Sequence, residues 1–198
     1  MGAFFQSLGR TITAGVVVLI VLLVIVGAAT GHWIQVGTQG WWQFAIRWLH
    51  IGSGVMWIGL LWYFNFVQTP SMPKIPDAEK PAVTKVIAPA ALFWFRWAAM
   101  ATIIFGLILA GMNGYLGAAL SLHQPATAIG IGMWMGIIMW FNVWFIIWPN
   151  QKKVLGFVTV APDEKAAAAK LAGLASRINT MLSIGMLYFM VAQSHGGL

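Results

Sequence analysis

The run AGVVVLIVLLVIVGAA at residues 14–29 decides the class of this protein, because it contains only alanine, glycine, valine, leucine and isoleucine. With its flanks it covers residues 11–31, and about 20 mostly apolar residues suffice to cross a bilayer. Arg10 precedes the run, as a basic residue precedes the apolar stretch of a signal peptide. The run is long for a signal peptide, so we interpret residues 1–40 as a retained N-terminal anchor helix.

Four more segments are long and apolar enough to span a membrane, at residues 41–67, 89–111, 127–148 and 178–195. Hydrophobic residues make up 60% of the 198 residues and charged residues only 8%, whereas about 25% of a soluble domain is charged. A chain with so few charges cannot cover that much apolar surface in water. The sequence therefore predicts an all-α integral membrane protein with five transmembrane helices, forming a single domain in the lipid bilayer.

The net charge of +7 raises the question of nucleic-acid binding, but the basic residues stand between the apolar spans, where membrane topology explains them. We therefore expect no nucleic-acid partner. Cysteine is absent, which excludes disulfides, thiolate metal sites and the covalent attachment of a c-type haem.

Lysine and arginine outside the predicted spans all lie on one side of the membrane. The connections at residues 31–40 and 112–126 contain neither residue type. The basic residues stand before span one, in the connections between spans two and three and between spans four and five, or at the start of span five. These residues are Arg10, Lys74, Lys80, Lys85, Lys152, Lys153, Lys165, Lys170 and Arg177. The positive-inside rule then predicts a multi-pass protein of a bacterial inner membrane, with a cytoplasmic N-terminus and a periplasmic C-terminus.

The sequence contains an internal similarity. Residues 56–65 read MWIGLLWYFN and residues 133–142 read MWMGIIMWFN, so Met, Trp, Gly, Phe and Asn recur at an offset of 77. We interpret residues 41–111 and 127–195 as two helical hairpins, related as a parallel repeat about an axis along the membrane normal.

Polar and small residues within the hairpins suggest how their helices associate. Gly132 and Gly136 form a G-x-x-x-G pair that would allow two helices to approach closely. Each hairpin also contains an asparagine and an arginine at its cytoplasmic end, and a hydrogen bond between them is geometrically feasible. The pairs are Asn65 with Arg96 and Asn142 with Arg177, and we favour a structural clasp over a substrate site.

His50 is the residue that points most directly to chemistry, because an ionisable residue inside a span is a functional hypothesis by default. Arg47 lies three residues before it and Gly54 four residues after it, on one helical stripe. This stripe suits haem b: His50 would ligate the iron, Gly54 would let the macrocycle approach, and Arg47 would hold a propionate.

The other histidines offer a second ligand. All four histidines fall on the predicted periplasmic side, and His123 is the preferred axial partner of His50, with His195 as its competitor. His32 and His195 are individually better explained as polar caps at the interface. Copper is the alternative to haem, with Met56 or Met133 as a soft ligand.

The stretch from Trp48 to Gln68, with the pattern H-x₆-W-I-G-x₄-F-N, resembles the membrane domain of PuuD-type urate hydroxylases, the urate oxidase N-terminal family. The stretch from Trp140 to Pro149 resembles the same family. The resemblance implies a membrane oxidoreductase that passes electrons to a cytochrome c domain, often fused at the C-terminus. Because the chain has no cysteine, we expect a short form that lacks this domain.

Taken together, the residues and the resemblance predict a membrane-embedded redox protein that binds haem near the periplasmic face. Its partner would be a periplasmic cytochrome c or a larger respiratory-type membrane complex. One alternative is a membrane oxidoreductase acting on urate or another small molecule. Another is a non-catalytic packing subunit of a larger membrane complex.

Overall fold

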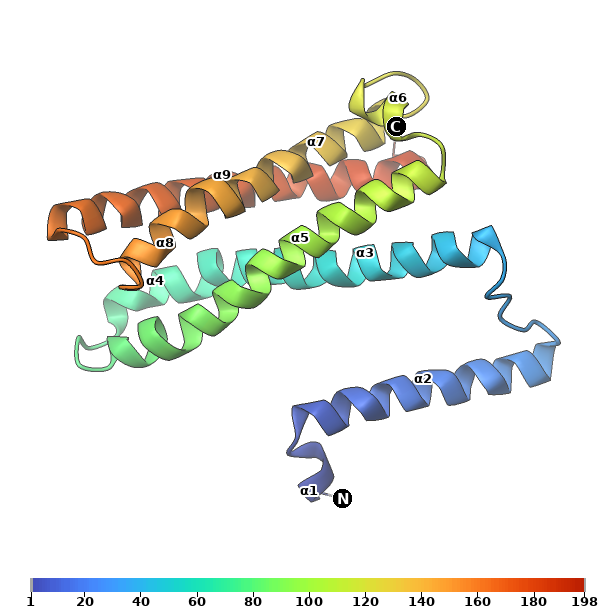
Figure 1. Ribbon diagram of the computed structural model, residues 1–198, viewed down its shortest axis with the longest axis horizontal. Coiled ribbons are helices and arrows are strands. Elements are labelled where there is room, and N and C mark those ends of the chain that lie inside the picture. The colour runs from blue at the N-terminus through green and yellow to red at the C-terminus, as the bar shows by residue number, and fades with distance from the viewer. Residues whose placement is uncertain (1, 198) are drawn as a thin grey trace. The chain divides into compact units, whose positions relative to one another are not determined.

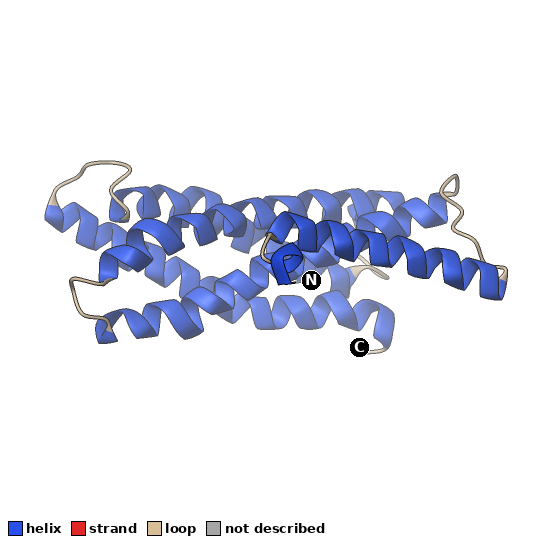
Figure 2. Ribbon diagram, turned by 90° about the horizontal axis from the view of Figure 1, so that it is seen from below, coloured by secondary structure: helices blue, strands red, loops and turns tan. Residues whose placement is uncertain are grey.

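The computed structural model describes residues 2–197, and within this range every regular element is a helix (Figure 1, Figure 2). The chain divides into two compact units, with the boundary between Phe44 and Ala45. The first unit is the predicted anchor, and the second contains the two predicted hairpins.

The first unit consists of α1 (Gly2–Phe5), α2 (Leu8–Thr30) and the segment that leads into α3. Helix α2 ends at Gly31, whose φ of +73° suits glycine and whose N–H donates to the Gly27 carbonyl. A glycine suits position 27 as well, because a Cβ there would lie 2.7 Å from Cε3 of the Trp33 indole. The apolar side chains of α2 are otherwise exposed, which is expected of a helix that faces lipid.

The second unit consists of four long helical stretches, which continue through short changes of helix type, and of the short helix α6. Their elements are α3 (Gln39–Trp62), η1 (Tyr63–Gln68), α4 (Thr69–Ser71) and η2 (Met72–Lys74); η3 (Ala82–Ile87) and α5 (Ala88–Met112); α6 (Leu116–Leu120); α7 (Thr127–Phe141), η4 (Asn142–Ile147) and α8 (Trp148–Val154); and α9 (Pro162–His195). Helices α7 and α9 lie side by side along their length (Figure 1).

The prediction of five membrane spans is confirmed. The helices long and apolar enough to cross a bilayer are Leu8–Thr30, Gln39–Lys74, Ala82–Met112, Thr127–Val154 and Pro162–His195. The protein is thus a multi-pass membrane protein. The last helix begins 16 residues earlier than the apolar pattern predicts, because an alanine-rich stretch is strongly helix-forming and Asp163 and Glu164 suit a helix N-terminus.

Each π-helix in the described part of the chain is followed by a proline. The segments η1, η3 and η4 precede Pro70, Pro89 and Pro149, each of which is the second residue of the α-helix that follows. A proline inside a helix clashes with the carbonyl four residues earlier and has no N–H to donate. The wider π turn accommodates the proline while the helix continues. Two of these segments follow the same apolar stretch in the two predicted hairpins, while the repeat itself stays a prediction.

Small residues bring α7 and α9 together, as the G-x-x-x-G pair suggested. A Cβ at Gly132 would lie 3.2 Å from the backbone nitrogen of Met190. Gly136 of α7 lies against Met186 of α9, and Gly185 of α9 lies against Met135 of α7. The two backbones therefore approach so closely that larger side chains at Gly132 would push them apart.

The asparagines near the helix ends both bond to α9, and this differs from the proposed Asn–Arg clasp. Asn65 Nδ2 donates to the Ser176 hydroxyl at 2.8 Å, and Asn142 Nδ2 donates to Asn179 Oδ1 at 2.8 Å. Asn179 is fully buried and donates in turn to the Met139 carbonyl at 2.9 Å. Asn65 thus bonds to the other predicted hairpin, which spacing within one hairpin does not reveal, whereas Asn142 bonds within its own hairpin but to Asn179 instead of Arg177.

Arg96 also has a different partner from the expected one. Its guanidinium carbon lies 3.4 Å from the centre of the Trp148 ring, a cation–π contact between α5 and α8. A guanidinium is weakly hydrated and stacks well on an indole, so Trp148 is a suitable partner at the end of a span.

Candidate functional site

The His50 side chain extends from α3 and is fixed by α5. Its Nδ1 lies 2.8 Å from the backbone carbonyl oxygen of Thr102. A carbonyl oxygen can only accept, so Nδ1 must carry the proton and donate it. In the neutral imidazole the other nitrogen, Nε2, then holds the free lone pair. This is the arrangement in which a histidine is ready to ligate a metal ion.

Gly106 provides the surface on which the imidazole rests. A Cβ built on Gly106 would lie 2.9 Å from Cε1 and 3.1 Å from Nδ1 of His50. Gly106 lies one helical turn after Thr102 on α5. The Thr102 hydroxyl donates to the Ala98 carbonyl at 2.7 Å, so His50 interacts with the backbone of this turn rather than with its side chains. The absence of a side chain at Gly106 therefore sets the position of the ring.

The other two residues of the predicted stripe lie on either side of His50. Gly54 faces α5, because a Cβ there would approach the Thr102 methyl group to 3.9 Å. Arg47 is exposed and lies three residues before His50 on α3. Burial raises the pKa of the Tyr115 hydroxyl in the α5–α6 connection, and the positive charge of Arg47 opposes this increase. Arg47 thus lies at the end of the bundle, where an interfacial anion would be within reach.

The remaining predicted ligands make local hydrogen bonds. His123 is exposed between α6 and α7, with Nδ1 2.8 Å from the Ser121 hydroxyl. His195 is exposed at the end of α9, with Nδ1 3.1 Å from the Val191 carbonyl. No group of three or more His, Cys, Asp or Glu side chains that could hold a metal ion occurs in residues 2–197. The pairing of His50 with His123 or His195 stays a prediction.

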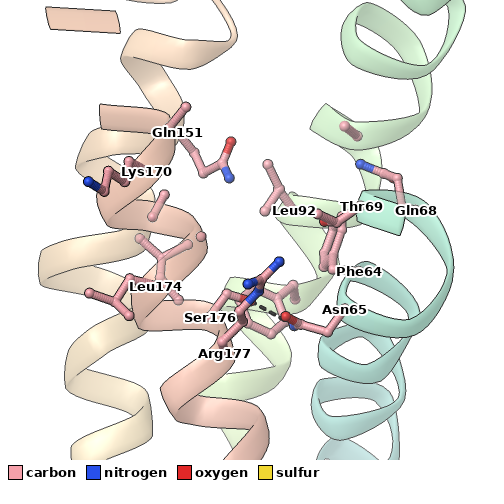
Figure 3. Close-up of a pocket in the computed structure, with 16 residues that line it drawn as sticks. Phe64, Asn65, Gln68, Thr69, Leu92, Gln151, Lys170, Leu174, Ser176 and Arg177 are labelled. Carbon is pink, nitrogen blue, oxygen red and sulfur yellow. Dashed lines mark hydrogen bonds between the residues drawn. The ribbon is translucent and has the colours of Figure 1, made fainter. Parts of the chain in front are cut away.

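A cavity of about 500 Å³ lies at the other end of the second unit, among η1, α5, η4, α8 and α9 (Figure 3). Its polar lining includes Asn65, Gln68, Gln151, Ser176 and Arg177. Figure 3 shows the side chains of Gln68 and Gln151 on opposite walls, with the Asn65–Ser176 hydrogen bond below both of them and Arg177 beside it. The sequence analysis did not identify this cavity.

Comparison with known proteins connects part of the chain to a family. Residues 121–197 match the urate oxidase N-terminal domain. No curated protein and no solved structure matches the chain. The match includes the stretch from Trp140 to Pro149, one of the two on which the resemblance rests, and the stretch from Trp48 to Gln68 lies outside it.

The segment that matches this family covers α7, η4, α8 and α9 together with His123 and His195. A second cavity, of about 430 Å³, lies within it near Gln193. The Gln193 amide already donates to the Pro125 carbonyl at 2.9 Å and accepts from the Ile129 N–H at 3.2 Å. This cavity consequently offers fewer free polar groups than the larger one.

The sequence analysis also missed Thr102 and Gly106, which lie outside the matched domain and fix His50. Thr102 has no distinctive signal in one sequence, because it contributes a backbone carbonyl, which every residue has. The sign available for Gly106 was its place in the middle of an apolar span, where a close approach by another group is expected.

Proposed function

We propose that this protein is a membrane-embedded haem protein that transfers electrons, with His50 as an axial ligand of haem b. One observation carries the proposal: the Nδ1–H of His50 is held by the Thr102 carbonyl at 2.8 Å, which leaves Nε2 for iron. Haem b supplies one-electron chemistry when it is bound. The hydrogen bond at Nδ1 orients the ring and raises the basicity of Nε2.

The residues around His50 fit such a ligand. A neutral imidazole between apolar helices suits haem, and Arg47 lies one helical turn closer to the end of the bundle. A guanidinium in that position can bind a propionate in bidentate fashion at the membrane interface. His123 is the proposed second ligand and His195 the alternative, both contributed by the urate oxidase N-terminal domain.

We place the His50 end of the bundle at the periplasmic face of a bacterial inner membrane. Electron exchange would then occur with a periplasmic cytochrome c or with a larger respiratory-type complex. The support is the distribution of basic residues, since the connections at residues 31–40 and 112–126 contain no lysine or arginine.

This orientation makes a prediction about accessibility. We expect the Lys152–Lys170 connection to resist protease added to the periplasmic side of spheroplasts and to be cleaved in inverted membrane vesicles. A reporter enzyme that is active only in the periplasm should be active when it is fused after the C-terminus. Cleavage of the connection in intact spheroplasts would place His50 on the cytoplasmic side and contradict the proposed periplasmic partner.

The test of the haem proposal is an absorption spectrum of the full chain purified from haem-replete cells. We expect a Soret band that shifts on reduction by dithionite, at a stoichiometry near one haem per chain. A protein that lacks a Soret band and contains copper would identify copper as the cofactor in place of haem, with Met56 or Met133 as a ligand. A protein that contains neither haem nor copper would support the alternative of a packing subunit of a larger complex.

The family match favours a second candidate, oxidation of urate, because the matched domain bears the name of a urate oxidase. The same spectrum tests it. If urate is the electron donor, its addition to the oxidised protein should reduce the haem iron and shift the Soret band as dithionite does. An unchanged band would assign the site to electron transfer with another donor.

A further inference from the structure

The cavity at the end opposite His50 is a ligand site in its own right. We propose that it binds a phosphate ester that carries a hydroxyl group, the chemistry of an anionic glycerophospholipid headgroup. This proposal does not depend on haem. Gln68 lies 18 residues after His50 along α3 and η1, which corresponds to about 27 Å at 1.5 Å per residue. This is close to the thickness of a hydrocarbon core, about 30 Å, so the cavity lies at the level of the opposite headgroups.

The charge of the cavity selects an anion. Lys170 and Arg177 both belong to its lining, and no aspartate or glutamate does. Figure 3 shows the guanidinium of Arg177 between the helices and the ammonium of Lys170 turned away from the cavity. The ion pairs of the described residues use other cations, namely Lys80 with Asp77 at 2.6 Å and Lys153 with Glu164 at 2.7 Å. The guanidinium of Arg177 is therefore left for a ligand, and basic pockets between transmembrane helices are known sites for lipid headgroups.

The polar amides of the lining specify a ligand that donates as well as accepts. The amide of Gln151 extends into the cavity from the wall formed by α8 (Figure 3). Its oxygen accepts hydrogen bonds and its nitrogen donates them, so a hydroxyl group in the cavity would suit it. A phosphate beside Arg177 with a hydroxyl at Gln151 would satisfy both requirements.

The two predicted hairpins differ in the residue that stands before the proline, and this difference bears on the cavity. In the second hairpin the residue between η4 and its proline is Trp148, and its indole covers the guanidinium of Arg96 at 3.4 Å. In the first hairpin the residue between η1 and its proline is Thr69, which lines the cavity together with Arg177. Arg177 corresponds to Arg96, because each of them is followed four residues later by a methionine, Met181 and Met100 respectively. The space next to Arg177 is thus the space that an indole occupies next to Arg96.

The experiment is native mass spectrometry of the full chain released from mixed phosphatidylglycerol and phosphatidylcholine micelles. We expect phosphatidylglycerol to be retained about tenfold more strongly than phosphatidylcholine, which corresponds to about 1.4 kcal/mol. Arg177→Gln should remove this preference. Thr69→Trp should remove it as well, because the indole fills the cavity while every charge remains. Gln151→Leu should weaken retention of phosphatidylglycerol without changing that of phosphatidylcholine.

The matched control is Lys165→Gln, which removes one positive charge from the same helix at a residue outside the cavity. Equal loss in Lys165→Gln and Arg177→Gln would show that overall charge attracts the lipid, and would overturn the proposal. Unchanged retention in Thr69→Trp would overturn it too, provided that the melting temperature of the variant equals that of the wild type. Competition by free glycerol 3-phosphate would support a soluble phosphate ester as the ligand; no competition, with the lipid preference intact, would support the lipid.

Discussion

His50→Ala should eliminate the Soret band of the purified protein, with the haem content falling by about tenfold or more. The reason is that the variant loses the imidazole whose Nε2 is left free by the Nδ1–Thr102 hydrogen bond. The backbone of α3 keeps its hydrogen bonds, so insertion into the membrane should be unchanged. Haem quantification by the pyridine haemochrome method, normalised to protein in detergent, measures the effect.

Arg47→Ala provides the graded comparison for this result. Arg47 is exposed, and a propionate at the interface can still be hydrated in its absence, so we expect most of the haem to remain. The order wild type, Arg47→Ala, His50→Ala is the informative outcome, since a general folding defect would not follow it. Full haem content in His50→Ala would rule out this histidine as a required ligand.

Gly106→Ala should lower haem affinity by about 10- to 100-fold while the protein stays folded. The added methyl group would lie 2.9 Å from Cε1 of His50, and the imidazole is the group that can move. Displacement of the ring breaks its hydrogen bond to Thr102 and turns Nε2 away from its present position. Haem titration of the apo protein, followed at the Soret band, measures the change.

Gly111→Ala is the matched control on the same helix, because a Cβ at Gly111 meets nothing within 4 Å. We expect unchanged haem affinity and a slight gain in thermal stability, since alanine favours a helix over glycine by about 0.5–1 kcal/mol. Equal haem affinity in Gly106→Ala and Gly111→Ala would contradict the proposed role of the α5 surface in positioning His50.

The five spans could be predicted because hydrophobicity over about 20 residues is a local property of the sequence. The close approach of α7 and α9 was also predictable, since the pair Gly132 and Gly136 has a spacing that places both on one face. The start of α9 at Pro162 could be predicted too, because a proline in the first turn and the acidic residues Asp163 and Glu164 favour the start of a helix there.

The site was less predictable, because it depends on which helix faces which. His50 was found from its place within a span, but its partner Thr102 contributes a backbone carbonyl, which every residue has. The cavity beside Arg177 depends on helices that are distant in sequence, and the asparagine of the first hairpin bonds to Ser176 rather than to Arg96. The sequence by itself does not show which face of each span contacts which of the other helices.

The wide turns before the prolines have a consequence for how the two hairpins can diverge. A π turn closes its hydrogen bond one residue further along than an α turn, so it absorbs an added residue without breaking the helix. Asn65 lies five residues before Pro70, whereas Asn142 lies seven residues before Pro149. Insertions and deletions at these turns would reorient the polar ends of the helices and leave their hydrophobic segments in register. New ligand specificity could therefore arise at one membrane surface while the opposite surface keeps its geometry.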